Sequence, residues 1–434
     1  MTTDGTKIHN LAKKLWPLNR SITGDGVRQT LKVIQEIIPP LEIFEVLSGT
    51  NVFDWTVPPE WEVKQAYIIS PTGKKFCDFE RNNLHLVGYS APINKTVSLK
   101  ELQDHLYSLP EQPTAIPYIT SYYEERWGFC ISHFEREKLV DGDYQVVIES
   151  SFFNGVLNYG EVLIRGETEE EVFLSTYVCH PSMANNELSG PTVLTYLTEW
   201  LLNQKKLRYS YRIVFIPETI GSITYLSKNY KELKSKVVAG FNISCVGDDR
   251  SYSYVPSRNG QTLSDEVAQH VLKWTDENYT SYGWKDRGSD ERQYCAPGID
   301  LPIASICRSK YGTYPEYHTS LDDLINVVTP QGLQGGFDAI RRALVAIENN
   351  VYPQVKVLCE PQLGRRGLYE TLSRTNSSNA SSVTVDLISW SDGQYSLLEI
   401  AEKIGVPIWE LYDVLDTLSL HSLIEKHDNK AKPI

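Results

Sequence analysis

Apolar residues recur at helical spacing along the first forty residues of the chain. Two stretches carry this pattern, and a polar turn over 21–26 separates them. The pattern predicts helix from about Gly5 to Ile38 with a break at that turn, because one face of a helix repeats every three to four residues. Pro39 and Pro40 end the second helix, and alternating apolar and polar positions over 41–47 predict a strand.

A regular alternation of strand and helix patterns begins after Tyr144. Apolar, β-branched runs predict strands over 144–149, 161–165, 172–178, 211–216, 237–245 and 303–307. Amphipathic patterns predict helices over 188–202, 222–227, 264–275 and 333–350. Strands that alternate with helices indicate a mixed or parallel sheet covered by helices on both faces, and therefore an α/β fold.

The segment from 51 to 140 has a different texture, rich in aromatic residues, proline and short β-type runs. Strands are predicted over 64–70 and 75–79 around a hairpin turn, and a helix predicted over 98–109 begins with a capping box. We predict a small inserted β-rich domain over 51–140. Its aromatic side chains either pack its own core, which we favour, or shape a binding cleft.

The C-terminal region follows a polar stretch over 374–382 that is typical of a linker. Helices are predicted over 384–390, 396–404 and 408–418, and this spacing resembles a winged helix. We therefore predict three domains: a discontinuous main domain over 1–50 and 141–352, the insertion over 51–140, and a winged-helix-like domain over 353–434. The expected recognition helix carries Glu410, Asp413 and Asp416 without Lys or Arg, which disfavours binding to nucleic acid.

Charge and cysteine content narrow the class of protein. The chain has 434 residues, and its 42 Lys and Arg against 55 Asp and Glu give a net charge of −13, which argues against a nucleic-acid-binding body. Its seven cysteines are scattered without a CxxC motif, which fits reduced thiols and predicts a cytoplasmic location. We find no signal-peptide pattern and no apolar run that could span a bilayer, so no membrane partner is expected.

Four residues that could bind or activate a metal ion follow predicted strands. His180 ends the strand over 172–178, Glu218 ends the next strand, and Asp290 and His318 lie in later loops. A single histidine at a strand end is more simply interpreted as a hydrogen-bonded side chain. Loops after parallel strands, however, meet at one edge of a sheet, so these four side chains are expected to converge. Two imidazoles and carboxylates, with an open position for water, are what a hydrolytic zinc site requires.

The order of these motifs resembles the zinc aminopeptidase and glutaminyl cyclase superfamily. The motifs are His180 with Asn186-x-x-Ser189-Gly190, then Pro217-Glu218-x-x-Gly221-Ser222, then Gly288-Ser289-Asp290, then Tyr317-His318-Thr319-x-x-Asp322. The aromatic insertion and the C-terminal winged helix resemble a bacterial branch of aminopeptidase-like proteins often linked to polysaccharide biosynthesis. The resemblance implies a zinc-exopeptidase-like mixed sheet, with His180 and His318 as metal ligands.

Three positions leave a role open or depart from the superfamily pattern. Glu218 stands alone where the superfamily has a Glu-Glu pair, so it is either the catalytic base or a metal ligand. Asn186 replaces the aspartate that bridges two metal ions, and the next ligand position falls near Ser244, with Asp248 close behind. An uncharged amide bridges two cations poorly, so one zinc ion is expected rather than two.

The remaining candidates follow from their places in these motifs. Asp290 joins Glu218 as a catalytic residue, Asn186, Glu316 and Tyr317 are assigned to substrate binding, and Asp322 supports His318 from behind. This set predicts an aminopeptidase-like, single-zinc hydrolase that cleaves an amide bond of a small peptide, an amino-acyl compound or an acylated sugar. The alternatives are a metal-free binding protein and a regulator that acts through its winged helix. Assembly into a homo-oligomer is left open.

Overall fold

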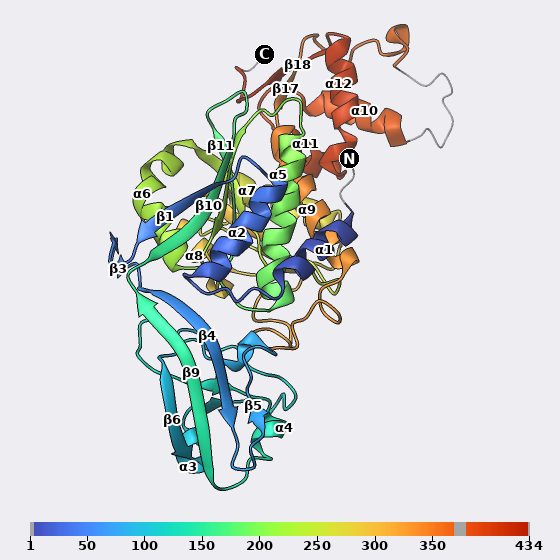
Figure 1. Cartoon of the computed structure of the whole chain (residues 1–434). Helices are drawn as coiled ribbons and strands as arrows, with labels where there is room; N and C mark the ends of the chain where they lie inside the picture. The colour runs from blue at the N-terminus through green and yellow to red at the C-terminus, as the bar shows by residue number, and fades with distance from the viewer. Residues whose placement is uncertain (1–3, 369–378, 433–434) are drawn as a thin grey trace. The chain divides into compact units, whose positions relative to one another are not determined.

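The computed structural model describes residues 4–368 and 379–432 (Figure 1). The chain divides into two compact units, Met1–Asp265 with Asn278–Asp338, and Glu266–Glu277 with Ala339–Ile434. None of the helices in the described ranges combines the length and the apolar character that a bilayer crossing requires.

An eight-stranded mixed sheet forms the centre of the first unit. Its strand order is β1-β10-β12-β11-β13-β16-β14-β15. The neighbours β12, β11, β13 and β16 are parallel, whereas β1–β10, β10–β12 and β16–β14 are antiparallel pairs. The strands are β1 (Glu42–Leu47), β10 (Val156–Ile164), β11 (Glu171–Tyr177), β12 (Ser210–Ile216), β13 (Val237–Asn242), β14 (Ser253–Val255), β15 (Thr280–Ser281) and β16 (Ile303–Cys307).

Helices cover both faces of this sheet. Every residue of β11 and β12 is buried, as expected for central strands that are covered on both sides. Right-handed crossovers place α5 and α6 on opposite faces, and Figure 1 shows α1 and α2 beside α5. The helices of this unit are α1 (Gly5–Leu15), α2 (Asp25–Ile37), α5 (Ser189–Leu202), α6 (Ile220–Lys236) and α8 (Glu291–Tyr294), while α7 (Leu263–Lys273) and α9 (Pro330–Glu348) are divided between the two units. The predicted α/β fold class is therefore confirmed.

A second sheet lies in the region of the predicted insertion. It has four antiparallel strands in the order β5-β4-β9-β6, flanked by the two-stranded pairs β2–β3 and β7–β8. Its elements are β2 (Asn51–Val52), β3 (Trp55–Thr56), β4 (Glu60–Ile69), β5 (Lys75–Phe76), β6 (Ile93–Ser98), α3 (Leu99–Gln103), β7 (Leu106–Tyr107), β8 (Phe129–Cys130), α4 (His133–Arg136) and β9 (Asp143–Phe153).

Two local predictions in this region differ from the structure. The strand predicted over 144–149 does not belong to the central sheet, because β9 pairs with β4 and β6. The helix predicted over 98–109 ends at Gln103, since Leu106 and Tyr107 pair with β8. The Ser98 side chain caps this helix as expected, accepting a hydrogen bond from Glu101 N–H. The domain boundaries themselves stay a prediction.

The second unit contains the C-terminal winged helix. Ser396 and Glu399 form a capping box that starts α11, and Gly405 ends that helix in the left-handed conformation. The predicted linker over 374–382 falls partly outside the described residues, and its last four positions begin α10. The elements are β17 (Tyr352–Val355), α10 (Asn379–Trp390), α11 (Leu397–Ile404), α12 (Tyr412–Leu420) and β18 (Ile424–His427).

Candidate active site

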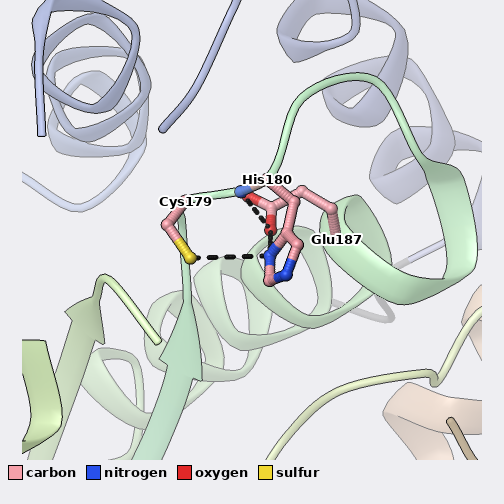
Figure 2. Close-up of side chains that lie close together, drawn as sticks. All are labelled: Cys179, His180 and Glu187. Carbon is pink, nitrogen blue, oxygen red and sulfur yellow. Dashed lines mark hydrogen bonds and ion pairs between the residues drawn. The ribbon is translucent and has the colours of Figure 1, made fainter. Parts of the chain in front are cut away.

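His180 lies just beyond the carboxyl end of β11, in the loop that leads to α5. Its backbone nitrogen and its Nδ1 both lie 3.0 Å from Oε2 of Glu187, as Figure 2 shows. Glu187 is wholly buried and belongs to one turn of π-helix, Ala184–Leu188, a feature often found at functional sites. Because Glu187 occupies Nδ1, the Nε2 atom of His180 is left for another partner.

The Glu187 carboxylate is itself held by Arg20, which lies between α1 and α2. Arg20 Nε donates to Glu187 Oε1 over 3.1 Å and to the His180 carbonyl over 2.9 Å. Both side chains of this ion pair are 0% exposed. A buried ion pair persists when its charges compensate each other and are hydrogen-bonded. Arg20 therefore fixes Glu187 and, through it, the His180 ring.

The same contacts set the charge of His180. Burial alone would lower the pKa of the imidazole, but the neighbouring Cys179 sulfur and the Glu187 carboxylate outweigh this effect and raise its pKa. The Cys179 sulfur lies 3.5 Å from His180 Nδ1 and accepts a hydrogen bond from Glu218 N–H. Cys179, His180 and Glu187 thus form a compact group of ionisable side chains (Figure 2).

Two carboxyl groups come from separate loops: Glu218 follows β12, and Asp290 directly precedes α8. Glu218 Oε2 lies 3.6 Å from His180 Nε2, and its side chain is 23% exposed. Asp290 is fully buried, and its Oδ1 accepts hydrogen bonds of 2.7 Å from Thr219 N–H and from the Ser222 hydroxyl. Burial, together with the charge of Glu218, raises the pKa of Asp290 to about 7, and burial also raises the pKa of Glu218. Carboxyl groups that hold a proton near neutral pH are typical of catalytic sites.

His318 faces His180 from the loop before α9. The two ring centroids are 5.8 Å apart, and Tyr317 stacks on the His318 ring at 3.9 Å. Burial and the nearby charge of His180 lower the pKa of His318 to about 3, so this imidazole is neutral at pH 7. Its Nε2 is buried and has no hydrogen-bond partner among the described residues. A neutral, unpartnered imidazole nitrogen is a suitable metal ligand.

The inserted region holds the His318 loop in place. Tyr118 N–H donates to the His318 carbonyl over 2.8 Å, and Ser320 N–H donates to the Ile116 carbonyl over 2.9 Å. The Tyr118 ring packs against both histidines, with its centroid 5.3 Å from that of His180 and 5.1 Å from that of His318. The insertion is therefore part of the site.

A cavity of about 380 Å³ opens beside these groups. His180, Glu218 and His318 line it together with Cys179 and Thr219. Residues of the inserted region also line it, namely Trp55, Tyr118, Thr120, Tyr122 and Tyr123, together with Ile22 and Ile220 from the main domain. The volume matches that of small-molecule sites. The favoured interpretation of the aromatic residues as core holds for Trp61 and Tyr89, which are buried and stacked, whereas these others shape the cleft.

The remaining predicted residues lie behind or beside the cavity. Asn186 is buried, and its amide donates to the Tyr177 hydroxyl over 2.8 Å. Asp322 accepts hydrogen bonds from the N–H groups of Asn185 and Asn186, and burial raises its pKa to about 6. It therefore supports the His180 loop directly. Glu316 pairs with Arg250 through two hydrogen bonds of 2.8 and 2.9 Å.

Asp248 does not join the carboxyl groups at the cavity. Its oxygens accept hydrogen bonds from Asn185 Nδ2, from the backbone of Arg250 and from the backbone and hydroxyl of Ser309. Ser244 is buried, and its hydroxyl has no partner among the described residues.

Sequence reasoning missed Arg20, Glu187 and Tyr118. Glu187 lies within the Asn-x-x-Ser-Gly motif, directly before the apolar helix that follows, so an acidic residue at this point was an available signal. Arg20 and Tyr118 contact the site only through tertiary structure, and no local pattern marks them.

Comparison with known proteins assigns the chain to a family. A family described as "Domain of unknown function (DUF4910)" matches residues 9–350, and a "winged helix-turn-helix" family matches residues 350–426. The chain belongs to the DUF4910 family. A family relative from Clostridium acetobutylicum, named "Putative polysaccharide biosynthesis protein with aminopeptidase-like domain", is 44% identical over 416 residues, which is 95% of each chain.

Solved structures show the same fold. The crystal structure of a "putative peptidase" from Clostridium acetobutylicum has a TM-score of 0.91 and 42% identity, covering 97% of this chain and 96% of that one. A zinc aminopeptidase from Bacillus subtilis has a TM-score of 0.59 and 13% identity, covering 80% of this chain and 95% of its own. The main domain of this DUF4910 protein therefore has the aminopeptidase fold that its motifs resemble, followed by a winged helix.

Proposed function

We propose that this protein is a single-zinc hydrolase that cleaves an amide bond of a small substrate. The buried Nε2 of His318 carries the proposal, because it has no partner among the described residues, and the His318 and His180 side chains line the same cavity. Two imidazole nitrogens and one carboxylate leave an open position on a four-coordinate zinc ion. Asn186 brings no charge to bridge a second ion, which favours one ion.

His180, His318 and one carboxylate would hold the zinc ion, which when bound acts as a Lewis acid toward water and the substrate carbonyl. Glu218 and Asp290 divide the remaining work. The carboxylate that is not a ligand accepts a proton from the attacking water and returns it to the leaving nitrogen. The water oxygen bonds to the carbonyl carbon and the C–N bond breaks. A free amine and a carboxylic acid leave, so the atoms balance.

The comparisons support the proposal at the level of fold and family. The Bacillus subtilis structure of this fold is a zinc aminopeptidase, and the clostridial relative is named for an aminopeptidase-like domain. A role in polysaccharide biosynthesis, named for that relative, belongs to the proposal. A cytoplasmic location also belongs to it, because all seven cysteines are free.

Elemental analysis of the full-length protein, purified without chelator and incubated with zinc, tests the proposal. We expect about one zinc ion per chain, and we expect His180→Ala and His318→Ala to lose most of it. His421→Ala is the matched control, because His421 is exposed in the second unit. Glu218→Gln should abolish release of free amine from a panel of amide substrates.

A protein without bound metal would support the alternative of a binding protein. Asn186 favours that alternative, because it stands where the superfamily has a metal-bridging carboxylate, and its amide is instead engaged in a hydrogen bond to the Tyr177 hydroxyl. Full zinc content in both histidine variants, or none in the parent protein, would overturn the hydrolase proposal.

A further inference from the structure

The wall of the cavity that the inserted region supplies contains aromatic side chains that are unusually open. Trp55 is 40% exposed and Tyr123 is 55% exposed. Their ring centroids lie 5.6 Å apart at an interplanar angle of 73°, an edge-to-face arrangement that leaves ring faces open to a ligand. Large exposed aromatic groups at the mouth of a cavity are typical of a surface that a ligand covers.

The backbone at this wall is strained. Tyr123 has a φ of +64°, in the left-handed region that side chains other than glycine rarely adopt. Such strain persists where the surrounding structure imposes it, and it concentrates at binding sites. The conformation therefore agrees with a binding role for the Tyr123 ring.

The chemistry of the wall indicates an uncharged, hydroxylated ligand. None of the described residues that line the cavity is Lys or Arg, so away from the two histidines a phosphate or carboxylate would find no cation on this wall. The lining offers tyrosine and threonine hydroxyls beside flat rings, and its aliphatic side chains among the described residues are Ile22 and Ile220. Burial raises the pKa of Tyr122 and Tyr123 to about 12, so both hydroxyls stay protonated and can donate.

A sugar ring has the matching chemistry. Its C–H groups pack against the negative face of an aromatic ring, while its hydroxyl groups bond to tyrosine and threonine. A pure apolar pocket for an amino-acid side chain would not need hydroxyl groups along its wall. The cavity of about 380 Å³ is large enough for one sugar ring with a short acyl group.

We propose that Trp55, Tyr122 and Tyr123 bind the sugar ring of a neutral N-acylated amino sugar and direct its amide toward His180, Glu218 and His318. This assignment rests on the proposed hydrolase function and names its substrate class. Hydrolysis then adds water across the amide C–N bond and yields the free amino sugar and the carboxylic acid of the acyl group.

Calorimetric titration of the full-length protein with the N-acetyl derivatives of glucosamine, galactosamine and mannosamine tests the assignment. We expect saturable, roughly millimolar binding of at least one sugar. Trp55→Ala should weaken it by about ten-fold, while Trp55→Phe retains most of the affinity because the ring face remains. Trp274→Ala, an exposed tryptophan of the second unit, is the matched control and should bind the sugar like the parent.

Two further results separate this assignment from the proposed hydrolase function. Zinc content and the thermal unfolding midpoint of Trp55→Ala should match those of the parent, since among the described residues the Trp55 ring packs against Tyr123 and not against either histidine. A protein that hydrolyses leucine amide with zinc but binds none of the sugars overturns the sugar assignment alone, as does unchanged sugar affinity in Trp55→Ala. A protein without zinc or hydrolysis that still binds sugar through Trp55 overturns the hydrolase function alone.

Discussion

Replacement of Arg20 by methionine tests how the site is supported. Methionine fills a similar volume but removes the charge that compensates Glu187, and both side chains of this pair are 0% exposed. Breaking one partner of a buried ion pair costs about 3–5 kcal/mol, because the other charge remains buried and unpaired. The carbonyls of Leu15 and His180 also lose their donors. We therefore expect Arg20→Met to lower the unfolding free energy of the first unit by about 4 kcal/mol.

A double-mutant cycle with Glu187→Gln separates the charge effect from packing. The double variant buries no unpaired charge, so it should be more stable than the sum of the two single losses predicts, by about 2 kcal/mol or more. Hydrogen exchange of peptides from β11 and β12 over a urea series measures the unfolding free energy of this unit. Lys14→Met is the control, because Lys14 and its partner Glu36 are 56% and 65% exposed and such a pair contributes about 1 kcal/mol or less.

Arg20→Met also reports on function. Arg20 fixes Glu187, which orients His180, and loss of a group that orients a metal ligand typically weakens metal binding by about 10–100-fold. A loss of stability below about 1 kcal/mol, or strictly additive losses in the cycle, would refute the conclusion that Arg20 and Glu187 act as a compensating pair.

Three other outcomes can be checked independently. Asn186→Asp should raise the bound zinc from about one ion toward two per chain, because it restores a bridging charge; unchanged stoichiometry by elemental analysis would contradict this. Asp290 has a folded pKa of about 7, above its ordinary 3.8, so its contribution to stability is complete below pH 3.8 and declines as the pH rises toward 7. The free energy of unfolding of Asp290→Asn, relative to that of the parent, should therefore increase between pH 4 and pH 8 by up to about 4 kcal/mol. A difference that stays constant over this range would refute the raised pKa of Asp290. The full-length protein should not shift a DNA duplex at physiological salt, because α12 carries Asp413 and Asp416; a shift at micromolar protein would overturn this expectation.

The sequence predicted the central sheet well because its strands are continuous apolar runs. β11, β12 and β16 lie within a residue or two of their predicted bounds, whereas the break between α1 and α2 overlaps the turn predicted over 21–26 but begins earlier, because α1 ends at Leu15. The short strands β14 and β15 escaped prediction, since two or three residues carry no readable period.

The site was only partly accessible from the sequence. His180, Glu218 and His318 follow strands or sit in recognisable motifs, and the structure brings them to one cavity. Tyr118 reaches the same cavity through hydrogen bonds with the His318 loop, 200 positions further along the chain. Such long-range pairing depends on how the inserted region packs, and no local pattern of apolar and polar residues encodes it.

The ion pair between Arg20 and Glu187 also has a consequence for biosynthesis. Its two partners are separated by 167 positions, and the ribosome delivers the arginine first. At typical elongation rates of about 5–20 residues per second, roughly 10 to 30 seconds pass before the glutamate is made. During that interval the guanidinium cannot be buried without an unpaired charge. The segment between α1 and α2 must therefore remain hydrated on the nascent chain and dock only after the π-helical turn has left the ribosome.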